Sequence, residues 1–117
     1  FSVSPEREKA FDMVRQFYVL VDNHFKEKKM VQDYADMLHR SPKTLSNLFT
    51  TCGLPSPLRI IHERIEAEAK RLLLYSQKSA KEITEILGFE DQATFSRFFK
   101  KMTGESVSEY RKREKRE

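Results

Sequence analysis

The sequence predicts an all-α protein of seven helices. The chain has 117 residues, of which only three are glycine and four are proline, so few positions interrupt a helix. Between these residues the apolar side chains recur at spacings of three and four, which is the period of a helix and not of a strand. The longest apolar runs, such as residues 17–21, are far shorter than the roughly 20 residues needed to cross a bilayer. We therefore expect one small, soluble helical domain.

The first two helices are predicted from their apolar stripes. A short second helix is expected at residues 31–38, with Tyr34, Ala35 and Leu38 on its inner side. The stripe of the first helix follows steps of three and four residues and is expected to face the core. It consists of Phe11, Val14, Tyr18, Val21 and Phe25.

The third and fourth helices have clear boundaries. Ser41 is a suitable N-cap and Pro42 suits the first helical position, so the third helix is expected to start there and to end before Gly53. The fourth helix is the longest and is expected at about residues 57–75. Its expected core positions are Leu58, Ile61, Ile65, Ala69 and Leu72.

The last three helices are predicted from capping residues. Ser79 and Glu82 form a capping box that opens a fifth helix, which Gly88 ends. Asp91 caps a sixth helix that runs to about Met102. Ser106 and Glu109 form a second capping box, which opens a seventh, short helix before a polar tail at residues 111–117.

Charge and cysteine content restrict the class of function. Lys and Arg number 22 against 18 Asp and Glu, a net charge of +4, which permits a polyanionic partner without requiring one. The single cysteine, Cys52, excludes an internal disulfide and leaves no cluster suited to zinc. We expect a cytoplasmic domain without a cofactor, at residues 9–117, preceded by the end of an interdomain linker at residues 1–8.

The second half of the chain repeats the first. Each half contains a short helix, a tight turn and a second helix, the outline of a helix-turn-helix, and the second turn is one residue longer. The two units are expected at about residues 31–53 and 79–103. Tyr34, Ala35 and Leu38 match Ile83, Thr84 and Leu87 at an offset of 49 residues, and Leu45, Ser46, Leu48 and Phe49 match Phe95, Ser96, Phe98 and Phe99 at an offset of 50.

The outer faces of the third and sixth helices carry side chains that suit the major groove of DNA. Asn and Gln can bond adenine, Lys and Arg can bond guanine, and Ala suits the methyl group of thymine. Asp and Glu, which would repel phosphate, are missing from the middle of both faces. The candidate DNA-binding residues are Lys43, Ser46 and Asn47 in the third helix and Gln92, Ala93, Ser96, Arg97 and Lys100 in the sixth.

Residues 79–111, SAKEITEILGFEDQATFSRFFKKMTGESVSEYR, resemble the signature of the DNA-binding domain of the AraC family of bacterial transcription regulators. HERIEAEAKRLLLYS resembles the linker helix of that family, and YADMLHRSPKTLSNLF its first helix-turn-helix. The chain departs from the family pattern at Val107, where proline is usual, and at Thr84, where alanine is usual. The matching positions are Ile83, Gly88, Phe89, Phe95, Arg97, Phe99, Lys100, Gly104, Tyr110 and Arg111.

The resemblance implies that the third and sixth helices enter successive major grooves on one face of double-stranded DNA. A fourth helix of the expected length would span about 28 Å, close to the roughly 34 Å groove repeat. By position, the resemblance implies that Arg97 is also a candidate phosphate contact. The residues that would face bases are Lys43, Ser46 and Asn47 of the third helix and Gln92, Ala93, Ser96 and Arg97 of the sixth. The resemblance also implies an effector-binding or dimerisation domain outside this chain, and RNA polymerase as a candidate partner.

Other interpretations of the sequence lead to different classes of function. His62 and Glu66 have a spacing that suits a metal ion, but no third ligand lies nearby, so a surface pair is expected. The scattered histidines and the lack of a nucleophile with a local base predict that the chain is not an enzyme. The alternative to DNA binding is a protein-interaction module that docks a partner through the same polar faces.

Overall fold

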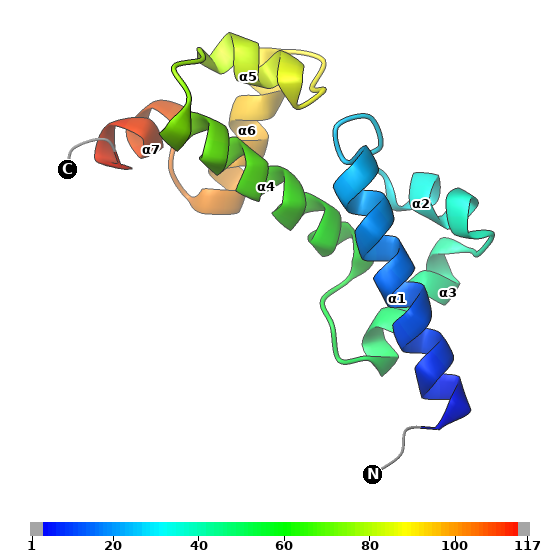
Figure 1. Ribbon diagram of the computed structural model, residues 1–117. Helices are drawn as coiled ribbons and strands as arrows, with labels where there is room; N and C mark the ends of the chain where they lie inside the picture. Colours follow the sequence, from blue (N-terminus) through cyan, green and yellow to red (C-terminus); the bar gives the residue numbers. More distant parts are fainter. Residues whose placement is uncertain (1–3, 115–117) are drawn as a thin grey trace. The chain divides into compact units, whose positions relative to one another are not determined.

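The computed structural model describes residues 4–114, and over this range it contains seven α-helices and no strand, which confirms the predicted fold class (Figure 1). The chain divides into two compact units, residues 1–64 and residues 65–117. Among the described residues, no helix has both the length and the apolar character needed to span a membrane. The helices are α1 (Pro5–His24), α2 (Val31–Leu38), α3 (Pro42–Thr51), α4 (Pro57–Tyr75), α5 (Ala80–Ile86), α6 (Gln92–Thr103) and α7 (Val107–Glu114).

Three aromatic rings form the centre of the first unit. Phe17 of α1 lies 5.4 Å from the ring of Tyr34 on α2 and 5.0 Å from the ring of Phe49 on α3. All three side chains are buried, and such tilted or edge-on contacts are the favoured geometries for aromatic pairs. The Tyr34 hydroxyl donates to the carbonyl of Lys28 at 2.7 Å, and burial raises the pKa of Tyr34 to about 12. These contacts hold α1, α2 and α3 together.

The buried stripe of α1 differs from the predicted one. Phe17 is 0% exposed, whereas Tyr18 is 39% exposed and its ring lies at the edge of the core, 6.5 Å from the ring of Phe49. Phe11 is also only partly buried. Stripes through either aromatic residue satisfy the helical period, and the packing of α2 and α3 against α1 selects the one through Phe17. The buried residues of α1 are Ala10, Val14, Phe17 and Val21.

The start of α1 lies within the segment expected to be a linker. The Ser4 hydroxyl accepts the backbone N–H of Arg7 at 3.2 Å, and Pro5 occupies the first turn. This cap and proline begin the helix at residue 5, so residues 5–8 are helical. Residues 1–3 of the expected linker lie outside the described residues.

The fourth helix has the predicted bounds but a partly different buried face. Leu58 is 43% exposed, because Ile60 takes the inner position near the start of the helix. Glu68 is a further buried position that the apolar pattern did not indicate, and its carboxylate accepts bonds from Arg71 at 2.9 and 2.6 Å. The expected core residues Ile61, Ile65, Ala69 and Leu72 are buried, as is Leu73.

Aromatic contacts also form the centre of the second unit. Phe95 and Phe99 on α6 are fully buried, with rings 6.1 Å apart. Phe89, in the turn before α6, packs its ring 5.4 Å from those of Phe95 and Phe98. Tyr110 on α7 meets Phe99 edge-on at 5.4 Å. The turn, α6 and α7 therefore share one apolar cluster.

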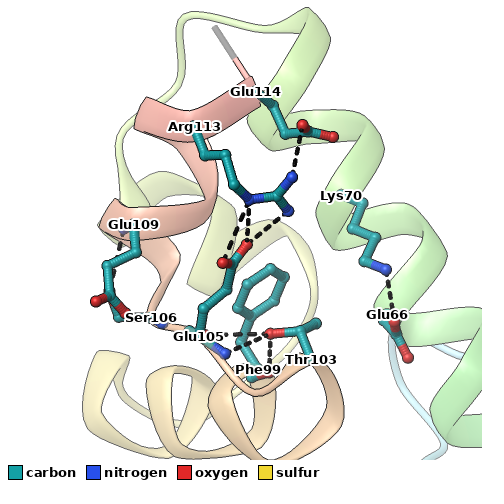
Figure 2. Close-up of polar contacts among 9 residues, drawn as sticks. All are labelled: Glu66, Lys70, Phe99, Thr103, Glu105, Ser106, Glu109, Arg113 and Glu114. Carbon is teal, nitrogen blue, oxygen red and sulfur yellow. Dashed lines mark hydrogen bonds and ion pairs between the residues drawn. The ribbon is translucent and has the colours of Figure 1, made fainter. Parts of the chain in front are cut away.

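Helix α7 is held by polar contacts at both of its ends and extends into the expected polar tail. Ser106 and Glu109 form the predicted capping box (Figure 2). The Arg113 guanidinium bonds the carboxylate of Glu105, with the shortest contact at 2.7 Å, and also pairs with Glu114 (Figure 2). Arg111 donates to the carbonyl of Leu73 at 3.1 Å. Residues 111–114 are therefore helical, and residues 115–117 lie outside the described residues.

Candidate nucleic-acid interface

The turn of the first helix-turn-helix is formed by a left-handed residue and a helix cap. His39 has φ of 57°, and the N–H of Arg40 donates to the carbonyl of Ala35 at 2.9 Å. The Ser41 hydroxyl then accepts the N–H of Thr44 at 3.1 Å, and α3 begins at Pro42. Residues 39–41 thus form the whole turn between α2 and α3. The turn places α3 against α1 and α2.

The second helix-turn-helix repeats this geometry with a longer turn. Gly88 takes the left-handed conformation, with φ of 78°, and the N–H of Phe89 donates to the carbonyl of Thr84 at 3.1 Å. The Asp91 carboxylate accepts the N–H of Thr94 at 2.7 Å and caps α6. The repeat predicted a turn one residue longer than the first, and the positions of the left-handed residues and caps confirm it.

Each second helix buries one face and exposes the other. Leu45 and Phe49 of α3, like Phe95 and Phe99 of α6, are almost completely buried and fix the rotation of the helix. All the predicted binding residues except Ser96, which is partly buried, lie exposed on the opposite faces: Lys43, Ser46, Asn47, Gln92, Ala93, Arg97 and Lys100. Within each helix, the predicted residues lie on the same side, opposite the buried residues. Their contact with DNA remains a prediction.

Among residues 4–114, the Lys and Arg side chains of the two helix-turn-helix units form none of the ion pairs that occur on α1 and α4. On α1 and α4, Arg15 pairs with Asp12 at 2.8 Å and Lys70 with Glu66 at 2.8 Å. By contrast, several cations of the helix-turn-helix units have no carboxylate within 4.0 Å among residues 4–114. They are Arg40, Lys43, Lys81, Arg97, Lys100 and Lys101.

The exposed faces of α3 and α6 also lack acidic residues. Neither α3 nor α6 contains Asp or Glu at any position. The nearest acid, Asp91, is occupied as the cap of α6, and the bond from the Thr94 N–H, with a smaller effect of Arg97, lowers the pKa of its carboxyl. Cations without local partners on acid-free helices suit contact with a polyanion.

Two further exposed residues of the first helix-turn-helix are candidates that the sequence patterns did not single out. Thr50 is exposed on α3 at the position that the internal repeat aligns with Lys100 of α6, so the repeat itself contained the signal. Arg40 is exposed in the first turn, where its guanidinium donates to the carbonyl of His39 at 3.0 Å. Periodicity could not indicate Arg40, because it lies between helices.

Three comparisons with known proteins agree with this geometry. A model of the helix-turn-helix domain family matches residues 34–113. The chain is 34% identical over 82 residues to the raffinose operon transcriptional regulatory protein RafR of Pediococcus pentosaceus, which covers 70% of this chain and 30% of that protein. It is 36% identical over 92 residues to the arabinose operon regulatory protein of Salmonella typhimurium, covering 79% of this chain and 31% of that protein.

A solved structure has the same fold. The C-terminal domain of AraT, a response regulator from Geobacillus stearothermophilus, superposes with a TM-score of 0.77 at 28% identity, covering 97% of this chain and 88% of that one. The present chain spans about a third of the length of the curated relatives it matches. The matched family, the identities and the shared fold together show that this chain belongs to the family of AraC-type helix-turn-helix DNA-binding domains.

Proposed function

We propose that this chain binds double-stranded DNA in a sequence-specific manner, with α3 and α6 as its two reading helices in successive major grooves. It would act as the DNA-binding part of a bacterial transcription regulator in the cytoplasm, with no catalytic activity of its own. The observation that supports this function best is the pair of exposed, acid-free faces, which present amide, hydroxyl and cationic groups from the same positions of two repeated units. An effector-binding or dimerisation domain and RNA polymerase are the further partners we propose.

Selection from a random duplex library tests the proposal directly. We expect the wild-type chain to enrich a defined sequence and to protect roughly two turns of DNA as a monomer, because both reading helices lie on one chain. Replacement of Gln92 or Ser96 by alanine should change the enriched bases. Each variant should lose about 1–3 kcal/mol of binding free energy on the wild-type sequence, the usual value of a direct base contact.

The matched control is Gln16→Ala, since Gln16 is exposed on α1 and not on a reading helix. This variant should enrich the same sequence as the wild type. Identical sequences from the Gln92 and Ser96 variants would show that these residues do not read bases, and protection of a single short half-site would contradict the use of both helices.

A salt titration separates DNA binding from the alternative function, a protein-interaction module. Each neutralised phosphate contributes about −0.9 to the slope of log affinity against log salt concentration. Lys43, Arg97 and Lys100 are candidates for contact with phosphates. If they make such contacts, replacing any one of them by glutamine should reduce the magnitude of the slope by about 0.9, the contribution of one phosphate. A slope near zero for the wild-type chain would favour the interaction module.

A further inference from the structure

Thr50 lies in the last turn of α3 and, by its angle around the helix axis, at the middle of the exposed face. A helix turns about 100° per residue, so Thr50 lies almost in line with Lys43, two turns earlier, and between the directions of Ser46 and Asn47. It is exposed, whereas the preceding residue, Phe49, is 1% exposed and packs against Phe17. The packing of Phe49 therefore fixes the direction in which Thr50 faces solvent.

The internal repeat gives Thr50 a counterpart in the second unit. Phe49 corresponds to Phe99, both buried, and the next residues are Thr50 and Lys100, both exposed. Lys100 has a long cationic side chain that can reach a phosphate, whereas Thr50 has a short, uncharged one. The two helix-turn-helix units thus present different chemistry at the same position, and the shorter side chain can contact a partner only if α3 approaches it closely.

The hydroxyl of Thr50 is engaged by its own helix. Its Oγ1 donates to the carbonyl of Ser46, one turn earlier, at 3.0 Å. This bond uses the only proton of the hydroxyl and turns the oxygen toward the backbone. Because the staggered positions at Cβ are fixed relative to one another, the methyl group occupies one of the two outward positions. The hydroxyl proton is therefore not available to a partner, and the methyl group is the part of the side chain left for a van der Waals contact.

We propose that Thr50 is a specificity-determining residue that selects thymine through contact between its methyl group and the C5-methyl group of the base. Thymine alone among the four bases presents a methyl group in the major groove, and a threonine methyl is one of the side-chain groups that contact it. The inference rests on the proposed function and adds to it the base read by the last turn of α3.

Deoxyuridine substitution tests this contact, because deoxyuridine is thymidine without the C5-methyl group. The probe is the duplex that the wild-type chain enriches, with its thymines replaced by uracil one at a time. We expect one replacement in the half-site bound by α3 to weaken binding by about fourfold, the effect of one buried methyl group. Thr50→Val, which keeps a methyl group, should retain this difference, and Thr50→Ser, which keeps only the hydroxyl, should abolish it.

Thr51→Ser is the matched control. Thr51 is also exposed, and its hydroxyl makes the same kind of bond, to the carbonyl of Asn47 at 3.0 Å, but it lies about 100° further around the helix. This variant should discriminate thymine from uracil as the wild type does. The proposal is overturned if no thymine replacement weakens wild-type binding, if Thr50→Ser keeps the discrimination, or if Thr51→Ser is the variant that loses it. Failure of the wild type to enrich any duplex would instead contradict DNA binding itself, at the selection step.

Discussion

The central position of Phe17 makes it the residue on which the first unit depends most. Its ring contacts the aromatic rings of both α2 and α3, and no part of it is exposed. Its neighbour Tyr18 contacts only Phe49 among these rings and remains 39% exposed, with burial and the nearby carboxylate of Glu63 raising the pKa of its hydroxyl. Two adjacent aromatic residues therefore contribute unequally to stability.

We expect Phe17→Ala to lower the free energy of unfolding by about 3–5 kcal/mol, the cost of removing a buried aromatic side chain. Tyr18→Ala should cost markedly less, because most of what it removes is already in contact with water. Urea denaturation followed by circular dichroism measures both values. Equal losses for the two variants would mean that the buried stripe of α1 is wrongly assigned.

At the scale of the element, short helices depend on their caps. The carboxylates of Glu82, Asp91 and Glu109 each accept a backbone N–H at a helix start, from Ser79, Thr94 and Ser106 respectively. These bonds are the largest cause of the lowered pKa of each carboxyl. Since α5 and α7 are short and expose much of their surface, we expect the caps to contribute to their formation.

A lowered pKa in the folded state means that these carboxylates stabilise the fold above the pKa of the unfolded chain. Their contribution should therefore decline as the pH falls below about 4.5 and disappear below the folded-state pKa. Glu82→Gln should reduce stability at neutral pH and show no difference from the wild type in strong acid. Urea denaturation across this pH range provides the measurement, with Glu85→Gln as the control because Glu85 lies on the same helix but caps nothing. A pH-independent difference would contradict a role for the charge of Glu82.

At the scale of the whole molecule, α4 is the helix that belongs to both compact units. We predict that its continuity determines the spacing of the two half-sites that the chain accepts on DNA. Ala69→Gly, near the middle of α4, should cost about 1 kcal/mol of stability and increase the affinity for sites with one base pair inserted or removed, relative to the unaltered site.

Binding titrations on duplexes with altered spacing measure this effect. Ala10→Gly is the control, since Ala10 is a buried alanine within α1 and its replacement has a similar propensity cost. It should leave the spacing preference unchanged. A wild-type chain that already tolerates both altered spacings would show that α4 does not constrain them.

The candidate interface was predicted largely from local patterns. The candidate residues of α3 follow from the helical period, because Leu45 and Phe49 define the inner side of the helix and leave Lys43, Ser46 and Asn47 outside. The hydrogen bond from the Thr50 hydroxyl to the Ser46 carbonyl could not be predicted in this way. It depends on which staggered position the hydroxyl occupies, and both outward arrangements are compatible with the same sequence.

The seven helices and the repeat of two helix-turn-helix units could be predicted from the sequence, because they depend on residues within a few positions of one another. The same is true of the caps Ser41, Ser79, Asp91 and Ser106. The side of α1 that is buried, and the side of the first turns of α4 that is buried, depend instead on packing between helices. Adjacent stripes through Phe17 or Tyr18 satisfy the helical period equally, and the choice between them is made by the rings of Tyr34 and Phe49, which lie on other helices. Local interactions select the helices, and packing between helices selects their faces.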